Sequence, residues 1–169
     1  MHKPTIHPDV IRRGNERRGR LRVFDSLRPE RGAHIVVDLQ DGFMAPSQVA
    51  EIATGHAIRL MCWPQDLRLP KRRFGAFSPG SSDLYAILRE RNIDMLIVTG
   101  TATQVCCEST ARDAMMLNYK VFFIADGNAT FNDDEPNATL SMAQAFCDVI
   151  DTDAMVGMIE RGRAEAVMA

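Results

Sequence analysis

"DMLIVTGTATQVCCESTARDAMMLNYKVFFIAD", residues 94–126, decides the fold of this chain. The apolar run 94–100 predicts a buried strand, and a second such run predicts another at 120–126. Between them, residues 107–118 form a predicted helix whose stop signal is Asn118. A strand, a helix and a strand in this order predict two parallel strands joined by a crossover helix.

The rest of the chain continues the same alternation of strands and helices. The further predicted elements are strands at 34–38 and 147–151 and helices at 84–93, 132–146 and 152–163. Ser82 and Asp83 provide a cap for the helix at 84–93, and Thr152 provides one for the last helix. This pattern predicts an α/β fold in which helices cover both faces of a parallel sheet.

The composition is that of an ordinary soluble globular protein. The 169 residues are 46% hydrophobic and 25% charged, and the formal net charge is −2. A charge so close to zero gives no general attraction to nucleic acid or anionic lipid, and no apolar run is long enough to span a membrane or to form a signal peptide. We therefore expect a cytoplasmic protein with reduced cysteines and without nucleic-acid or membrane partners.

Residues 1–32 have a composition of their own, and we expect them to form a basic N-terminal arm in front of a domain at 33–169. Six arginines lie between Arg12 and Arg22. They fit either a contact with nucleic acid or membrane, or a solvated helix that packs on the domain or on a partner subunit. The second interpretation is favoured, because no aromatic residues are interleaved and Asp9 and Glu16 lie among the arginines.

Three reactive groups follow predicted strands, at the sheet edge where α/β folds bind ligands: Asp38, the Cys106–Cys107 pair and Asp126. A thiol in the first turn of a helix meets free backbone N–H groups and the positive end of the helix dipole, which lower its pKa. A small buried cysteine at a helix start is equally sensible as packing. From the residues alone, catalysis and packing are evenly matched for one of the two cysteines.

Three blocks of sequence resemble the signature motifs of the isochorismatase-like cysteine hydrolases. They are "IVVDLQDGFM" (35–44), "PKRRFGAF" (70–77) and "TGTATQVCCESTARDAMMLNYKVFFIADGNAT" (99–130). The resemblance implies a three-layer α/β/α sandwich with a mainly parallel, Rossmann-like sheet. It also implies a catalytic triad of Asp38, Lys71 and Cys106, with Cys107 as a packing residue.

The chemistry implied by the resemblance is hydrolysis of a C–N bond. Asp38 would take the thiol proton, Lys71 would favour the thiolate, and Cys106 would form a covalent intermediate with a carbonyl carbon. The backbone N–H groups of Ala102 and Cys106 would form the oxyanion hole, after a cis peptide bond at Thr101–Ala102. The candidate substrate-pocket residues are Phe43, Phe74, Phe77 and Gln104. Gln104 and Gly75 depart from the family pattern, which usually has asparagine or aspartate at the first position and often serine at the second.

The resemblance also implies that the interval 45–70 is shorter than in relatives, and we expect it to lack one helix–strand unit after the first strand. That strand would then lie at an exposed edge, so we expect a homo-oligomer. The same interval holds the histidine metal ligands of nicotinamidase-like relatives, and His56 alone cannot replace them. We therefore expect no metal and no cofactor, and a small amide, ureido or carbamoyl compound as substrate.

Two other classes of function stay open. One is a non-catalytic isochorismatase-like remnant that acts in binding or assembly, because the short interval removes part of the pocket. The other is a nucleotide-binding module, which the fold alone would allow. The second is weak, because no G-x-G-x-x-G or Walker pattern follows any predicted strand.

Overall fold

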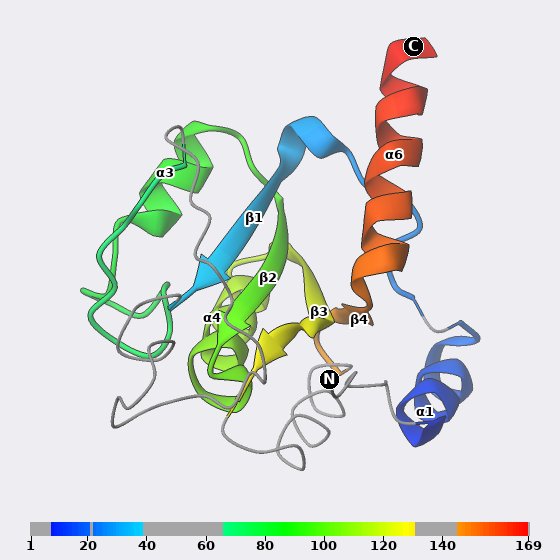
Figure 1. Cartoon of the computed structure of the whole chain (residues 1–169), viewed down its shortest axis with the longest axis horizontal. Coiled ribbons are helices and arrows are strands. Elements are labelled where there is room, and N and C mark those ends of the chain that lie inside the picture. Colours follow the sequence, from blue (N-terminus) through cyan, green and yellow to red (C-terminus); the bar gives the residue numbers. More distant parts are fainter. Residues whose placement is uncertain (1–7, 21, 39–65, 131–144, 169) are drawn as a thin grey trace.

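The computed structural model describes residues 8–20, 22–38, 66–130 and 145–168 (Figure 1). Most of the predicted helix at 132–146 lies outside these residues, and its last two positions are in a turn. Most of the short interval 45–70 also lies outside them. The helices are α1 (Pro8–Arg18), α3 (Leu84–Glu90), α4 (Glu108–Met116) and α6 (Thr152–Met168), with short helical turns η1 (Pro29–Arg31) and η2 (Thr103–Cys107). The strands are β1 (Gly32–Val37), β2 (Met95–Thr101), β3 (Lys120–Ala129) and β4 (Asp148–Ile150).

The four strands form one sheet in the order β1-β2-β3-β4, and every pair is parallel. The predicted parallel sheet is confirmed. β3 runs three residues further than the sequence indicates, to Ala129, because the pairing register shifts between Val98 and Gly100 of β2 and then resumes at Asn128. Among the described strands β1 lies at one edge, with the side chain of Val36 47% exposed.

Helices cover both faces of the sheet, as predicted (Figure 1). On one face, α3 and α4 contribute Leu84, Leu88, Ala111 and Ala114 to a core that includes Leu96, Val98, Val121 and Phe123 of the strands. On the other face, Met155 and Met158 of α6 pack with Leu27 against Met95, Phe122 and Ile124. Alternate strand residues enter opposite cores, as the pleat requires. The result is a three-layer α/β/α arrangement.

The predicted helix ends are only partly confirmed, because α3 ends at Glu90 instead of residue 93 and α6 continues to Met168 instead of ending at residue 163. The predicted stop at Asn118 is confirmed, since this residue follows α4 and adopts a left-handed conformation with φ of 67°. The cap of α6 is not Thr152, as predicted, but Asp151, whose carboxylate accepts a hydrogen bond from the Ala154 N–H at 2.7 Å. Thr152 is the first helical residue, and its N–H and hydroxyl both donate to Asp126.

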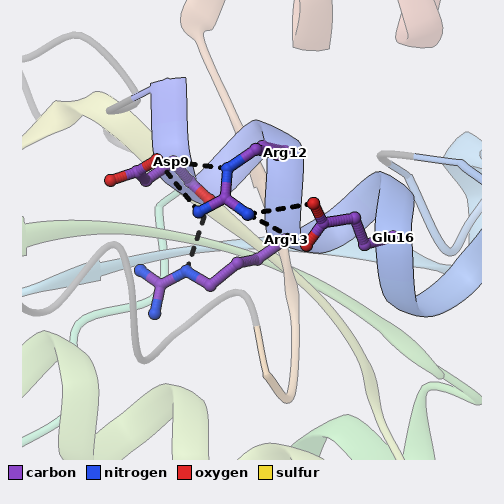
Figure 2. Close-up of polar contacts among 4 residues, drawn as sticks. All are labelled: Asp9, Arg12, Arg13 and Glu16. Carbon is purple, nitrogen blue, oxygen red and sulfur yellow. Dashed lines mark hydrogen bonds and ion pairs between the residues drawn. The ribbon is translucent and has the colours of Figure 1, made fainter.

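The N-terminal helix α1 is amphipathic, and part of its charge is neutralised within the helix. Figure 2 shows the Arg12 guanidinium between the carboxylates of Asp9 and Glu16, at 3.2 Å and 2.9 Å. Exposed pairs of this kind contribute little to stability, because solvent screens the charges. Val10 is fully buried on the opposite side of the helix. A solvated helix with one buried side is the arrangement that the sequence favoured.

The segment after α1 is tied to the sheet by a buried carboxylate. Asp148 of β4 is 1% exposed and accepts the backbone N–H groups of Val23 and Phe24 at 2.7–2.8 Å. The Phe24 ring then meets Phe122 edge to face, with a centroid distance of 5.4 Å. Residues 22–31 are therefore part of the same packed body as the sheet. The boundary between an arm and a domain at residues 32–33 stays a prediction.

Candidate functional site

The site begins where β1 and β2 end side by side. The register pairs Val37 with Gly100, so Asp38 and Thr101 are the next residues on neighbouring strands. The Thr101 hydroxyl donates to the Asp38 carbonyl at 2.9 Å, and Asp38 has a left-handed φ of 52°. Position 100 has to be glycine, because its φ is 131° and a Cβ there would lie 2.0 Å from the Val37 carbonyl oxygen. This close approach holds Asp38 beside the turn that follows β2.

Lys71 is held in place by three contacts. Its ammonium group forms an ion pair with Asp38, with Nζ to Oδ2 at 2.8 Å. It also donates to the carbonyl oxygens of Arg73 at 2.7 Å and Phe74 at 3.2 Å. An ammonium group has three N–H donors, so these contacts use all of them. Both side chains of the ion pair are only 15% exposed, which fixes the cation rather than leaving it on a mobile stem.

The turn between β2 and α4 carries both cysteines. The Thr101–Ala102 peptide bond is cis, as the family resemblance implied. Residues Thr103–Cys107 then form a single π-helical turn, in which the Ala102 carbonyl accepts the N–H groups of Val105 and Cys107 at 3.2 Å. The sequence predicted that Cys106 lies in the first turn of an α-helix. It lies instead in the π-helical turn before α4. π-turns of this kind occur often at functional sites.

The expectation that the pKa of Cys106 is lowered is wrong. Burial raises the pKa of this thiol to about 11 from its ordinary value of 9.0, and a hydrogen bond to Asp38 and its negative charge add to the increase. The charge of Lys71 and a hydrogen bond from the Ala102 backbone act in the opposite direction and are outweighed. The resting Cys106 is consequently a neutral thiol that is hydrogen-bonded to the Asp38 carboxylate.

Cys107 points away from this site into the core, which confirms its interpretation as a packing residue. It is fully buried in the cluster that includes Ala111 and Phe123, and burial raises its pKa well above the ordinary value. Cys147 is buried as well, and each of the three described cysteines is a thiol rather than half of a disulfide bond.

Asp38, Lys71 and Cys106 lie together in the wall of a cavity of about 810 Å³. The described residues that line it are Asp38, Lys71, Arg72, Arg73, Phe74, Gly75, Ser78, Gln104, Cys106, Glu108, Ser109, Arg112 and Asp113. Of the predicted pocket residues, Phe74 and Gln104 are in this wall, and the Thr130 hydroxyl donates to the Gln104 side-chain oxygen at 2.5 Å. Phe77 instead packs against the core, with its ring 5.7 Å from that of Tyr119, and Phe43 lies outside the described residues.

Sequence reasoning missed the charged far wall of the cavity. Ser109, Arg112 and Asp113 follow Cys106 at spacings of three, six and seven residues. On a helix this spacing places them along one face, so the periodicity carried the signal. Arg112 is paired with Glu108 at 2.6 Å, which is an i, i+4 pair on the same helix. Arg72 and Arg73 directly follow Lys71 in the sequence, and these two arginines were a second indication of a charged cavity wall.

Two kinds of site are not found in the described part of the chain. Among residues 8–20, 22–38, 66–130 and 145–168, no three His, Cys, Asp or Glu side chains come together in a way that could hold a metal ion. No helix in those same ranges combines the length and the apolar character that a membrane span needs.

The chain resembles known proteins over part of its length. An isochorismatase domain model matches residues 57–154, which is more than half of the chain. The chain is 35% identical to nicotinamidase 3 of Arabidopsis thaliana over 91 residues, and 36% identical to the ureidoacrylate amidohydrolase RutB of Cronobacter sakazakii over 103 residues. These matches cover 53% and 54% of this chain and 45% and 44% of the relatives, so the chain spans less than half their length.

The fold also matches a solved structure. A cysteine hydrolase from Pseudomonas syringae pv. phaseolicola superposes with a TM-score of 0.75 at 23% identity, over 83% of this chain and 97% of that one. At this identity the match supports the α/β fold alone.

Proposed function

The chain belongs to the isochorismatase family, and from that premise we propose that it is a cysteine hydrolase that cleaves the C–N bond of a small amide, ureido or carbamoyl compound. The observation that carries the proposal is the contact of Asp38 with both other groups. It forms an ion pair with Lys71 at 2.8 Å and accepts a hydrogen bond from the Cys106 thiol at the wall of the cavity. A nucleophile, its base and an orienting group within hydrogen-bonding reach are the signature of covalent catalysis.

In the first half of the proposed reaction, the Cys106 sulfur attacks the carbonyl carbon of the substrate while Asp38 takes the thiol proton. Direct transfer suits a thiol whose pKa is about 11, because almost none of it is ionised at neutral pH. The carbonyl oxygen becomes an oxyanion that accepts hydrogen bonds from the backbone N–H groups of Ala102 and Cys106. When the C–N bond breaks, the nitrogen takes the proton from Asp38 and leaves as ammonia or an amine.

In the second half, water hydrolyses the resulting thioester or thiocarbamate. Asp38 is a carboxylate again and accepts a proton from the attacking water, and this proton passes to the Cys106 sulfur as the C–S bond breaks. Lys71 does not enter the covalent steps, because its three N–H groups are occupied by Asp38 and two backbone carbonyls. Its role is to fix the carboxylate and to balance its charge.

The charge of the cavity restricts the substrate. The described lining residues include four cations and three anions: Lys71, Arg72, Arg73 and Arg112 against Asp38, Glu108 and Asp113. Two of the cations have anionic partners, Lys71 with Asp38 and Arg112 with Glu108. The balance that remains is positive, although the chain as a whole carries −2. A neutral or acidic amide therefore fits the cavity better than a cationic one.

The experiment is ammonia release from a panel of neutral and acidic amides and ureides. It uses the wild type, Cys106→Ala and Cys107→Ala, each with and without a chelator. Turnover should vanish in Cys106→Ala, and Cys107→Ala should keep most of it if folded. Mass spectrometry of the quenched wild type should find an acyl group on Cys106. Turnover that survives in Cys106→Ala, or that is lost with the chelator, would refute the mechanism.

The second candidate is a non-catalytic remnant, which the coverage of less than half of the curated relatives keeps open. A folded wild type that is inactive on the whole panel would favour it. We also retain the proposals of a cytoplasmic homo-oligomer without nucleic-acid or membrane partners. The exposed edge strand β1 motivates the oligomer, and a monomer by light scattering would refute it.

A further inference from the structure

The loop that holds Lys71 is itself held by α4, the helix that directly follows Cys106. The loop comprises residues 73–78, and its first two carbonyl oxygens accept the Lys71 hydrogen bonds. Immediately afterwards, the N–H of Ala76 donates to the Thr110 hydroxyl at 3.1 Å. Two residues further, the Ser78 hydroxyl donates to the Asp113 carboxylate at 3.1 Å. Thr110 and Asp113 both belong to α4.

The attachment is tight, and its burial sets it apart from an ordinary surface contact. Thr110 is fully buried and Ala76 is 5% exposed, so their hydrogen bond is formed away from solvent. Between the two attachment points, a Cβ on Gly75 would lie 2.5 Å from the Asp113 carboxylate and 2.7 Å from the Ser78 hydroxyl. The glycine leaves room beside the loop for the Asp113 carboxylate and the Ser78 hydroxyl.

We propose that Thr110 and the Ser78–Asp113 pair are positioning residues for the Lys71 cation, so that α4 sets both the nucleophile and the charge beside it. The inference rests on the roles of Lys71 and Cys106 in the proposed function. The nucleophile lies in the turn that leads into the helix, and the cation is attached to the same helix through the loop. A shift of the loop relative to α4 moves the Lys71 charge relative to the Cys106 sulfur.

The consequence is measurable on the thiol itself. Lys71 lowers the pKa of Cys106, against the stronger effects of burial and Asp38. If the loop is released from α4, this lowering weakens, and the pH profile of Cys106 alkylation moves to higher pH. A change that affects only folding would lower the unfolding temperature and leave this profile in place, which separates a positioning role from a structural one.

The test is the pH dependence of iodoacetamide labelling at the Cys106 peptide in the full chain, combined with kcat and KM on any amide that is turned over. Thr110→Val removes the acceptor at nearly constant volume, and Ser78→Ala removes the donor to Asp113. Both should slow labelling at pH 8 by about threefold or more and reduce kcat with little change in KM. Thr110→Ser keeps the hydroxyl and should restore the wild-type profile. Thr152→Val, which removes a threonine hydroxyl bond at the start of α6, is the matched control and should change nothing.

A double-mutant cycle with Lys71→Met decides whether the effect passes through the cation. Thr110→Val and Ser78→Ala should have no further effect on labelling once Lys71 is gone. Effects that add fully in the Lys71→Met background, or variants that change only the unfolding temperature, would overturn the inference. So would a Lys71→Met profile identical to that of the wild type. If Thr110→Val does not fold, Ser78→Ala on the half-buried loop decides whether the contacts with α4 position Lys71 or only stabilise the fold. Labelling needs no substrate, so it can be measured even if the wild type turns over no amide. In that case a profile shifted in the variants relative to the wild type would support the positioning of Lys71 and refute only the proposed hydrolysis.

Discussion

Replacing Asp38, the proposed base, should make Cys106, the proposed nucleophile, more reactive toward an alkylating agent while it abolishes turnover. Asp38→Asn removes a negative charge and the carboxylate that accepts the thiol hydrogen bond, which are two of the three causes that raise the pKa of Cys106. Burial is unchanged, and Lys71 is left without its carboxylate partner beside the sulfur. The pKa of Cys106 should therefore fall. Asparagine tolerates the left-handed backbone at this position, with φ of 52°, so the variant should fold.

The magnitude follows from the pKa of the thiol. With a pKa of about 11, roughly one thiol in 1,000 is ionised at pH 8, whereas at the ordinary value of 9.0 about one in 10 is ionised. A full return to the ordinary value, which is the upper limit because burial remains, would increase the thiolate population about 100-fold. The intrinsic nucleophilicity of a thiolate falls by about threefold per pKa unit, which removes about tenfold over the same change. The net expectation is faster labelling at pH 8, by at most about tenfold.

The assay is labelling of the Cys106 peptide with iodoacetamide between pH 6 and pH 11, next to ammonia release from the best amide. Asp94→Asn is the matched control, because Asp94 is also ion-paired, with Arg31 at 2.9 Å, but lies outside the cavity wall. Cys107 should label more slowly than Cys106 throughout, since it is fully buried. Slower or unchanged labelling in Asp38→Asn, or turnover retained in it, would refute the reasoning.

Three further predictions concern stability. Asp148→Ala should lower the free energy of unfolding by about 3 kcal/mol, because it leaves the backbone N–H groups of Val23 and Phe24 without their charged acceptor. Asp148→Asn should lower it by about half as much, and urea titrations measure both changes. Gly100→Ala should cost more than about 3 kcal/mol, since its Cβ collides with the Val37 carbonyl, and wild-type stability in this variant would contradict the register. The free energy of unfolding should also fall between pH 9 and pH 11. The pKa of Cys106 is raised in the folded chain, so the contribution of this thiol to stability is complete below pH 9 and is lost as the pH rises to about 11. The decrease of stability with pH should be less steep in Cys106→Ala.

Most of the fold could be predicted because local patterns and packing agree. The β-branched and apolar runs at 34–38, 94–100 and 120–126 became β1, β2 and β3, and each contributes buried residues to the sheet. The differences arise where tertiary contacts decide. The extension of β3 to Ala129 depends on a register shift against β2, and no residue of β3 indicates it. The cap of α6 moved by one residue because Thr152 is engaged by Asp126 of β3.

The candidate site could be predicted as a set of residues but not as an electrostatic state. Asp38, Lys71 and Cys106 follow from motifs, and the parallel strands bring their segments to one edge of the sheet. The pKa of the thiol depends on how much water surrounds it, which is a property of the packed turn. The sequence indicated a helix start and a lysine, both of which favour a thiolate. Burial and the neighbouring carboxylate outweigh them, and neither magnitude can be read from spacing.

The raised pKa and the ion pair have a common explanation in the charge balance of the site. At rest, the group contains one carboxylate, one ammonium and a neutral thiol, so its net charge is zero. Ionising Cys106 to solvent would leave two anions against the single cation of Lys71 in a poorly hydrated place, which burial penalises. Moving the same proton to Asp38 creates the thiolate without changing the net charge. The site therefore resists forming a free thiolate and yet permits the proton transfer that the proposed reaction requires. The same balance explains why Asp38→Asn should acidify Cys106: without the carboxylate, a thiolate becomes the anion that neutralises Lys71.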